Sequence, residues 1–215
     1  MHLPIALIQC ELQKRHSCHT VILYGSYARG DATETSDIDV IGIREHGDVR
    51  FDARLFHGVY LDAFICSEEH LADPPELLLD MKAARILCQK EDMGTRLLQT
   101  LTNRLQKGPK LLRSDEIQVI QTWRAKTLAR IRKGGLAGNF RRAEFLPEML
   151  KHLFITRGQW YPGHKAAFQW MEKERPELFH AFSEALAPGA PLSALENVAS
   201  LVDEVISKEA KPLDS

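Results

Sequence analysis

Short apolar runs separated by polar turns fill the first part of the chain, and this is the pattern of buried strands. The runs are rich in β-branched residues and are bounded by glycine or by charged residues. Four of them predict strands: TVILYG (20–25), DIDVIGIR (37–44), VYLDAFIC (59–66) and AARILCQ (83–89).

Helical patterns surround these runs. Ile5, Leu7, Ile8 and Leu12 recur near helical spacing and predict a short amphipathic helix at 4–15. The segment SEEHLADPPELLLD is predicted as helix or turn because two prolines interrupt it. A further helix is predicted at 93–108, where a glycine and then a proline end it.

Beyond residue 110 the apolar residues recur at helical spacing, and no run predicts a strand up to residue 209. Ser114 and the two acidic residues after it suit a helix start, which predicts a helix ending at Gly134-Gly135. The positions that recur along this helix are Ile117, Ile120, Arg124, Leu128 and Ile131.

Further helices are predicted at 141–157, 164–174 and 177–186, and Ser193 is predicted to cap a last one. We therefore predict an α+β protein with two domains. A mixed-sheet domain is expected at 1–110 and an all-helical domain at 111–215.

Composition excludes several classes of protein. The formal net charge is -1, so no global field favours nucleic acid or an anionic membrane. The four cysteines form no zinc-site spacing and are expected to be free thiols. The N-terminus lacks the features of a signal peptide, and no apolar run approaches the roughly 20 residues of a membrane span. We expect a cytoplasmic protein with no membrane partner.

Two aspartates stand within an apolar strand, where a charge is costly. Asp37 and Asp39 alternate with Ile38 and Val40, so both carboxylates point to one face. Like charges this close repel, and one carboxylate would normally take up a proton unless a divalent cation lies between them. Asp62 is a third carboxylate in an apolar strand. If the two strands are neighbours, the three aspartates can converge on one or two Mg²⁺ ions.

A glycine and a serine end the first predicted strand. Gly25 would allow the backbone to approach a ligand closely, and Ser26 offers a hydroxyl and an N–H to a phosphate. If a helix begins at Ser26, its N-terminal amides would face an anion, although the serine could equally be a helix cap. Gly30 would let the chain return towards the aspartates. Together these features predict a site for a metal-bound triphosphate.

In this order, GSYARG (25–30), SDIDV (36–40) and the downstream Asp62 resemble the signature of the DNA polymerase beta–type nucleotidyltransferase superfamily. The resemblance implies metal-dependent transfer of a nucleoside monophosphate from an NTP, with ATP as the expected donor. Asp37 and Asp39 would then ligate Mg²⁺, and Asp62 would be a third ligand or the base for the acceptor hydroxyl.

The resemblance also implies which residues hold the phosphates. Gly25 and Ser26 would hold the β- and γ-phosphates, and Ser36 belongs to the same motif. The helical half is more distantly similar to the C-terminal domain of aminoglycoside adenylyltransferases, through TRGQWYPGHKAAFQWMEKERPELF. If this similarity holds, Lys165 could reach the triphosphate. The acceptor would be an aminoglycoside-like or lincosamide-like antibiotic, and the protein would act in antibiotic resistance.

Several residues allow two interpretations. The basic segment 124–142 is interpreted as the solvated face of a helix followed by a loop, in preference to an anion patch for triphosphate or a tRNA end. Trp160, Tyr161 and Trp170 are expected in the core more than under a nucleobase. Arg29 and Asp31 are expected to pair or to be solvated. The histidines His46, His57, His152 and His164 lack metal-ligand spacing and are interpreted as structural.

Three hypotheses on function stay open at this point. The first is an enzyme that transfers AMP, or another NMP, to a small hydroxylated molecule. The second is a nucleotidyltransferase-like antitoxin that acts by binding a partner protein. The third is nucleotidyl transfer to a protein or to RNA, with RNA less favoured because the chain is near neutral. The sequence leaves a homodimer open.

Overall fold

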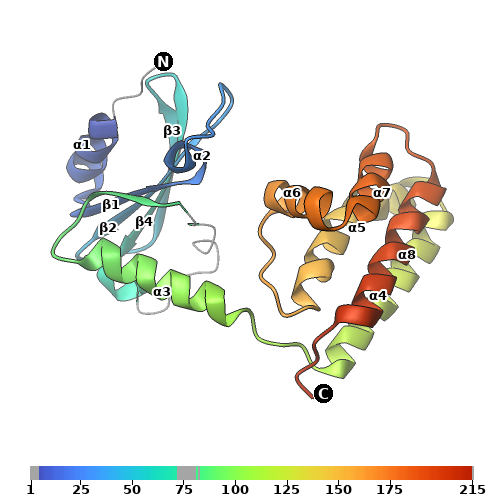
Figure 1. Ribbon diagram of the computed structural model, residues 1–215. Coiled ribbons are helices and arrows are strands. Elements are labelled where there is room, and N and C mark those ends of the chain that lie inside the picture. The colour runs from blue at the N-terminus through green and yellow to red at the C-terminus, as the bar shows by residue number, and fades with distance from the viewer. Residues whose placement is uncertain (1–4, 72–80, 82, 215) are drawn as a thin grey trace. The chain divides into compact units, whose positions relative to one another are not determined.

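The computed structural model describes residues 5–71, 81 and 83–214, and the chain divides into two compact units (Figure 1). The units are Met1–Lys107 and Gly108–Ser215. The predicted boundary at residue 110 lies close to this division. The expected α+β class is confirmed, because a mixed sheet is found in the first unit and the described residues of the second unit form helices and no strand.

The first unit consists of a sheet and its helices. In chain order its elements are α1 (Ile5–His16), β1 (Thr20–Tyr24), α2 (Gly25–Arg29), β2 (Ile38–Arg44), β3 (Arg50–Phe56), β4 (Val59–Ser67), the 3₁₀ helix η1 (Glu68–Leu71), β5 (Arg85–Cys88) and α3 (Met93–Lys107). The strand order is β3-β4-β2-β1-β5. β2 and β4 are parallel, and the other pairs are antiparallel.

Side-chain alternation gives the sheet two different faces. Val40 and Ala63 are fully buried and pack in one cluster with Ile8 and Leu12 of α1. Asp39 pairs with Asp62 in the parallel register of β2 and β4, so both lie on the opposite face. The sheet core therefore fixes the two aspartates side by side without burying them in it.

Two expectations for this unit need correction, and a third is tested only in part. Strand β3 was not predicted, because RFDARLF mixes charged and apolar residues and no uniformly apolar run marks it. Leu7 was assigned to the apolar face of the first helix, but it is exposed, whereas Ile8 and Leu12 are buried. The predicted helix or turn at 67–80 is a 3₁₀ helix over Glu68–Leu71, and its remainder lies outside the described residues.

The second unit contains five helices within the described residues. They are α4 (Ser114–Arg132), α5 (Gly135–Ile155), α6 (His164–Glu174), α7 (Pro176–Leu186) and α8 (Leu192–Glu209). Phe145, Met149, Phe182 and Val198 are fully buried in its single core, which α4 to α8 all enter. Among the described residues, no helix is both long and apolar enough to cross a membrane.

Helix starts in this unit differ from those predicted. Helix α5 begins at Gly135, so the segment predicted as a loop before residue 141 is helical. Pro191, and not Ser193, is the N-cap residue of α8. At α4 the N-cap residue is Arg113, whose backbone N–H donates to the Glu116 carboxylate at 2.8 Å. The glycine and serine residues in the sequence therefore predicted the helix boundaries of this unit only to within a few residues.

Arg124 corrects the interpretation of the basic segment as solvated. Its side chain is 2% exposed and pairs with Asp203 of α8. Burial, and then the charge of Arg124, lower the pKa of the neighbouring His152 to about 4. The helical period placed Arg124 on the apolar face of α4, and the structure confirms that position.

Asp52 joins β3 to α1, and its pKa predicts a pH-dependent stability. His16 Nε2 lies 2.7 Å from one carboxylate oxygen, and Arg54 Nε donates to the other at 2.9 Å. Burial would raise the pKa of Asp52, but these partners outweigh it and hold the pKa below 3.8. The carboxylate therefore stabilises the fold above the unfolded-state pKa, and this stability is lost as the pH falls through the lower folded-state value.

We expect Asp52→Asn to lower the free energy of unfolding at pH 7 by about 1.5–3 kcal/mol, the usual range for charged hydrogen bonds. The difference from the native chain should shrink as the pH falls below about 3.8. Hydrogen exchange of the buried β2 amides measures the stability of this unit. Tryptophan fluorescence would not, since Trp123, Trp160 and Trp170 all lie in the other unit. An equal difference at pH 7 and at low pH would contradict the assignment.

Candidate active site

Three carboxylates meet at one end of the parallel strands β2 and β4. Asp37 immediately precedes β2, Asp39 is its second residue, and Asp62 lies beside Asp39 on β4. One carboxylate oxygen of each residue lies within 4.8 Å of those of the other two. The convergence expected from the sequence is therefore present in the structure.

Gly25 brings the backbone against the same carboxylates. It has a φ of +68°, which favours glycine, and it begins the short helix α2 directly after β1. A Cβ placed on Gly25 would lie 1.9 Å from Asp39 Oδ2. No larger residue fits, so the main chain passes directly over the aspartate. The hydroxyl of Ser26, the next residue, makes no hydrogen bond with any described residue.

The loop between α2 and β2 is held by its own polar groups. Gly30 ends α2 with a φ of +85° and donates to the carbonyl of Ser26 at 2.9 Å. The hydroxyl of Ser36 accepts from the backbone N–H of Thr33 at 2.9 Å. The expected pairing of Arg29 with Asp31 is also present, at 3.2 Å. The loop therefore returns the chain to Asp37, as expected from Gly30.

Two of the three carboxylates have no basic partner among the described residues. The carboxylates of Asp37 and Asp62 make no hydrogen bond or ion pair with any described residue. Three carboxylates at this separation repel one another, and a divalent cation would relieve that repulsion. All three are oxygen ligands, as Mg²⁺ prefers, and their limit of 4.8 Å is close to the roughly 4.2 Å that two oxygens span across one ion at about 2.1 Å each. These residues fit one or two Mg²⁺ ions.

Apolar side chains flank the aspartates on the same face of the sheet. Leu55 and Tyr60 face each other across β3 and β4 and are 61% and 66% exposed, and Phe51 is 66% exposed. Tyr60 is two residues from Asp62 on β4, and Phe51 and Leu55 are each two residues from Ala53, which pairs with Asp62. All three side chains therefore lie on the same face of the sheet as Asp62. Sequence reasoning missed this surface because it missed β3. The signal was the alternation of Phe51, Ala53 and Leu55 in RFDARLF.

The helical unit holds the remaining predicted site residue. Lys165 is the second residue of α6 and is exposed. Tyr161 and Trp170 pack against the core of this unit, as expected. The contact of Lys165 with a triphosphate stays a prediction.

Comparison with known proteins identifies the region that carries the aspartates. Residues 7–88 match the family model described as a nucleotidyltransferase domain. This region includes β1, α2, β2 and β4, and therefore Gly25, Ser26 and all three aspartates. The resemblance drawn from the motif is confirmed for this unit.

Individual relatives overlap this chain unequally. A curated protein of Methanocaldococcus jannaschii, provisionally named as a protein adenylyltransferase, is 47% identical over 57 residues. The match covers 23% of this chain and 54% of the relative, so the chain spans about half the length of that relative. A nucleotidyltransferase-like protein from Exiguobacterium sibiricum, known from its crystal structure, aligns over 94% of this chain and 75% of its own, with 10% identity and a TM-score of 0.45. That similarity is too weak to carry an argument about shared features.

Proposed function

We propose, because residues 7–88 match the model of a nucleotidyltransferase domain, that this chain is a metal-dependent nucleotidyltransferase. It would transfer a nucleoside monophosphate, with ATP as the preferred donor, to a hydroxyl group of an acceptor. The observation that carries this proposal is the convergence of Asp37, Asp39 and Asp62 within 4.8 Å beside the main chain of Gly25.

The proposed reaction exchanges one P–O bond for another. The acceptor oxygen attacks the α-phosphorus, the bond to the β-phosphate breaks, and pyrophosphate leaves with the bonding electrons. Asp62 accepts the proton of the hydroxyl, directly or through water. Of the two aspartates within strands, Asp62 is exposed and Asp39 is half-buried, so Asp62 is the more accessible to an acceptor. Asp37 and Asp39 would hold the cation. When bound, Mg²⁺ would neutralise the phosphates and favour ionisation of the hydroxyl.

Backbone and hydroxyl groups would position the phosphate chain. The main chain of Gly25, which passes directly over Asp39, would approach the β- and γ-phosphates, and the hydroxyl of Ser26 is available to donate to them. Ser36 would act on the phosphates indirectly, because its hydroxyl holds the loop that ends at Asp37. Lys165 of the helical unit is proposed as a further phosphate contact, on the family resemblance alone.

The proposed acceptor is a small hydroxylated molecule of the aminoglycoside or lincosamide kind. The separate core of the helical unit supports this, because such a unit can build an acceptor pocket of its own. A protein acceptor is the second candidate. It is favoured by the provisional name of the archaeal relative and by the exposed Phe51, Leu55 and Tyr60 beside the aspartates.

Transfer from α-labelled NTPs in the presence of Mg²⁺ tests the proposal. We expect release of pyrophosphate and label on one class of acceptor when a library of hydroxylated antibiotics and a set of proteins are supplied in parallel. Label on a small molecule supports the first candidate, and label on protein supports the second. If no NTP binds with Mg²⁺ and no label moves, the chain is a binding protein such as an antitoxin, and the proposed activity is wrong.

A further inference from the structure

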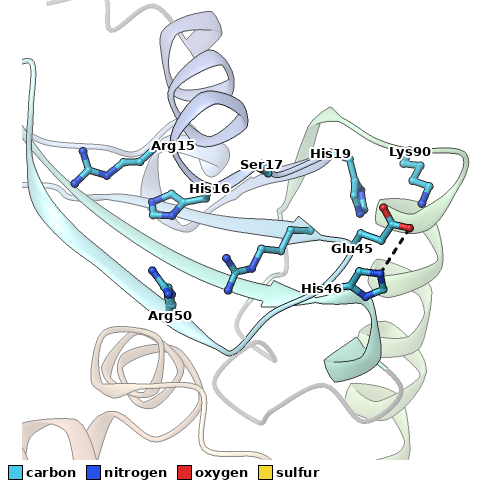
Figure 2. A pocket seen from close by; sticks show the side chains of 9 residues that line it. Arg15, His16, Ser17, His19, Glu45, His46, Arg50 and Lys90 are labelled. Carbon is cyan, nitrogen blue, oxygen red and sulfur yellow. Dashed lines mark ion pairs between the residues drawn. The ribbon is translucent and has the colours of Figure 1, made fainter.

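A pocket lies in the first unit, at the end of the sheet away from the aspartates. Its volume is about 480 Å³, within the range of small-molecule sites. Figure 2 shows its side chains around one hollow, contributed by the end of α1, the end of β2, the start of β3 and the segment after β5. Its cationic residues are Arg15, Arg44, Arg50 and Lys90, and three histidines line it as well.

Glu45 is the acidic residue that lines this pocket, and two nearby acids, Asp52 and Glu68, are already paired with other bases. Asp52 accepts from His16 and Arg54 and also lies 3.6 Å from Arg15. Glu68 lies 3.0 Å from Lys90 and also from His19. By contrast, no ion pair joins Arg44 or Arg50 to a carboxylate of any described residue. Glu45, which lies 3.9 Å from His46, offsets one of these two charges, so the pocket keeps a net positive charge.

Arg44 is held in place before any ligand arrives. Its Nη2 donates to the carbonyl of Asp48 at 2.6 Å, and Gly47 packs so closely that a Cβ there would lie 2.7 Å from this nitrogen. Its Nε is buried without a hydrogen-bond partner. A buried N–H donor without a partner is costly, and an anionic oxygen would satisfy it. A fixed guanidinium also loses little entropy when it binds a phosphate group.

Arg50 contributes a second guanidinium from another strand. It is exposed and makes no hydrogen bond or ion pair with any described residue. Arg44 and Arg50 belong to β2 and β3, which lie on either side of β4. Arg44 pairs with Ser67 and Arg50 with Ile65 of β4, so their backbones are two strand spacings and two residues apart, about 12 Å, and an elongated anion suits the pair better than a single phosphate ion.

We propose that this pocket binds a small anion with two or more phosphoryl groups, either inorganic pyrophosphate or the phosphate chain of a nucleotide. Its site is separate from the aspartates, since Arg44 is five residues beyond Asp39 on β2, or about 16 Å along an extended strand. The proposal does not depend on the transfer reaction, because none of the residues that line this pocket belongs to the carboxylate site.

Calorimetric titration of the full chain with pyrophosphate, in EDTA, tests the proposal. Removal of metal leaves three mutually repelling carboxylates at the other site, so they should not hold the anion. We expect saturable binding at one site that ATP competes for. Arg44→Gln with Arg50→Gln should weaken it by about tenfold or more per arginine, the effect of one lost charged hydrogen bond.

Two further variants make the result specific. Arg96→Gln with Lys107→Gln removes the same charge from exposed positions on α3 and should leave binding unchanged. Arg50→Gln alone should weaken binding with no change in melting temperature, because Arg50 has no described partner to lose. The proposal is overturned if pyrophosphate does not bind, or if the Arg44 and Arg50 variants bind as tightly as the native chain.

Discussion

Replacement of Asp39 by asparagine should lower the rate of nucleotidyl transfer by about 10²–10³-fold or more, the usual cost of one lost electrostatic contact in a transition state. Asparagine keeps the shape of the side chain and removes its charge. Asp39 lies in the middle of the site, paired with Asp62 across the strands and covered by Gly25. An effect on rate without unfolding would therefore report on its charge.

The same substitution at Asp37 or Asp62 should give a loss of similar size. Rates from α-labelled NTP at saturating Mg²⁺ measure it, and thermal melting verifies that each variant is folded. Asp92→Asn is the matched control, because Asp92 is 64% exposed and pairs with Arg96 at the start of α3. Near-native rates for all three active-site variants would contradict the assignment of these residues.

Gly25→Ala should abolish activity nearly as completely as loss of Asp39. The added Cβ would lie 1.9 Å from Asp39 Oδ2, far inside contact distance, and would displace either the carboxylate or the main chain that passes over it. The positive φ of Gly25 adds a backbone cost of about 1–2 kcal/mol for any residue with a Cβ. Both the rate and the free energy of unfolding should fall.

Gly30→Ala separates these two effects. Gly30 also has a positive φ, of +85°, but a Cβ there would meet nothing within 4 Å. It should lose about 1 kcal/mol of stability and keep most of its activity, since only the backbone cost applies. Transfer rates and urea unfolding of both variants measure the contrast. Equal rates for Gly25→Ala and Gly30→Ala would show that the approach of Gly25 to Asp39 does not matter for the reaction.

The site could be predicted from the sequence because its parts are local and ordered. Asp37 and Asp39 lie in one motif, Gly25 ends the strand before them, and Asp62 stands alone in an apolar strand. Carboxylates and glycine are unfavourable in an ordinary apolar strand, so their presence indicated a ligand site. Register then completed the arrangement, because β2 and β4 pair with Asp39 beside Asp62.

Features that depend on tertiary packing could not be predicted in this way. Strand β3 is an edge strand with charged residues towards α1 and exposed apolar residues on its other face, so its local pattern resembles a loop. The burial of Arg124 depends on Asp203 of α8, 79 residues later in the chain. The cationic pocket combines Arg44 and Arg50 with residues from other strands and helices, and no single segment marks it.

The central claim is that the three aspartates bind a nucleotide through a divalent cation. Its most direct test is calorimetric titration of the native chain and of the Asp37→Asn, Asp39→Asn double variant with a non-hydrolysable ATP analogue, each with Mg²⁺ and with EDTA. We predict that Mg²⁺ raises the affinity of the native chain at least about tenfold, or roughly 1.4 kcal/mol, and does not raise that of the double variant. Equal enhancement by Mg²⁺ in both proteins would contradict the claim.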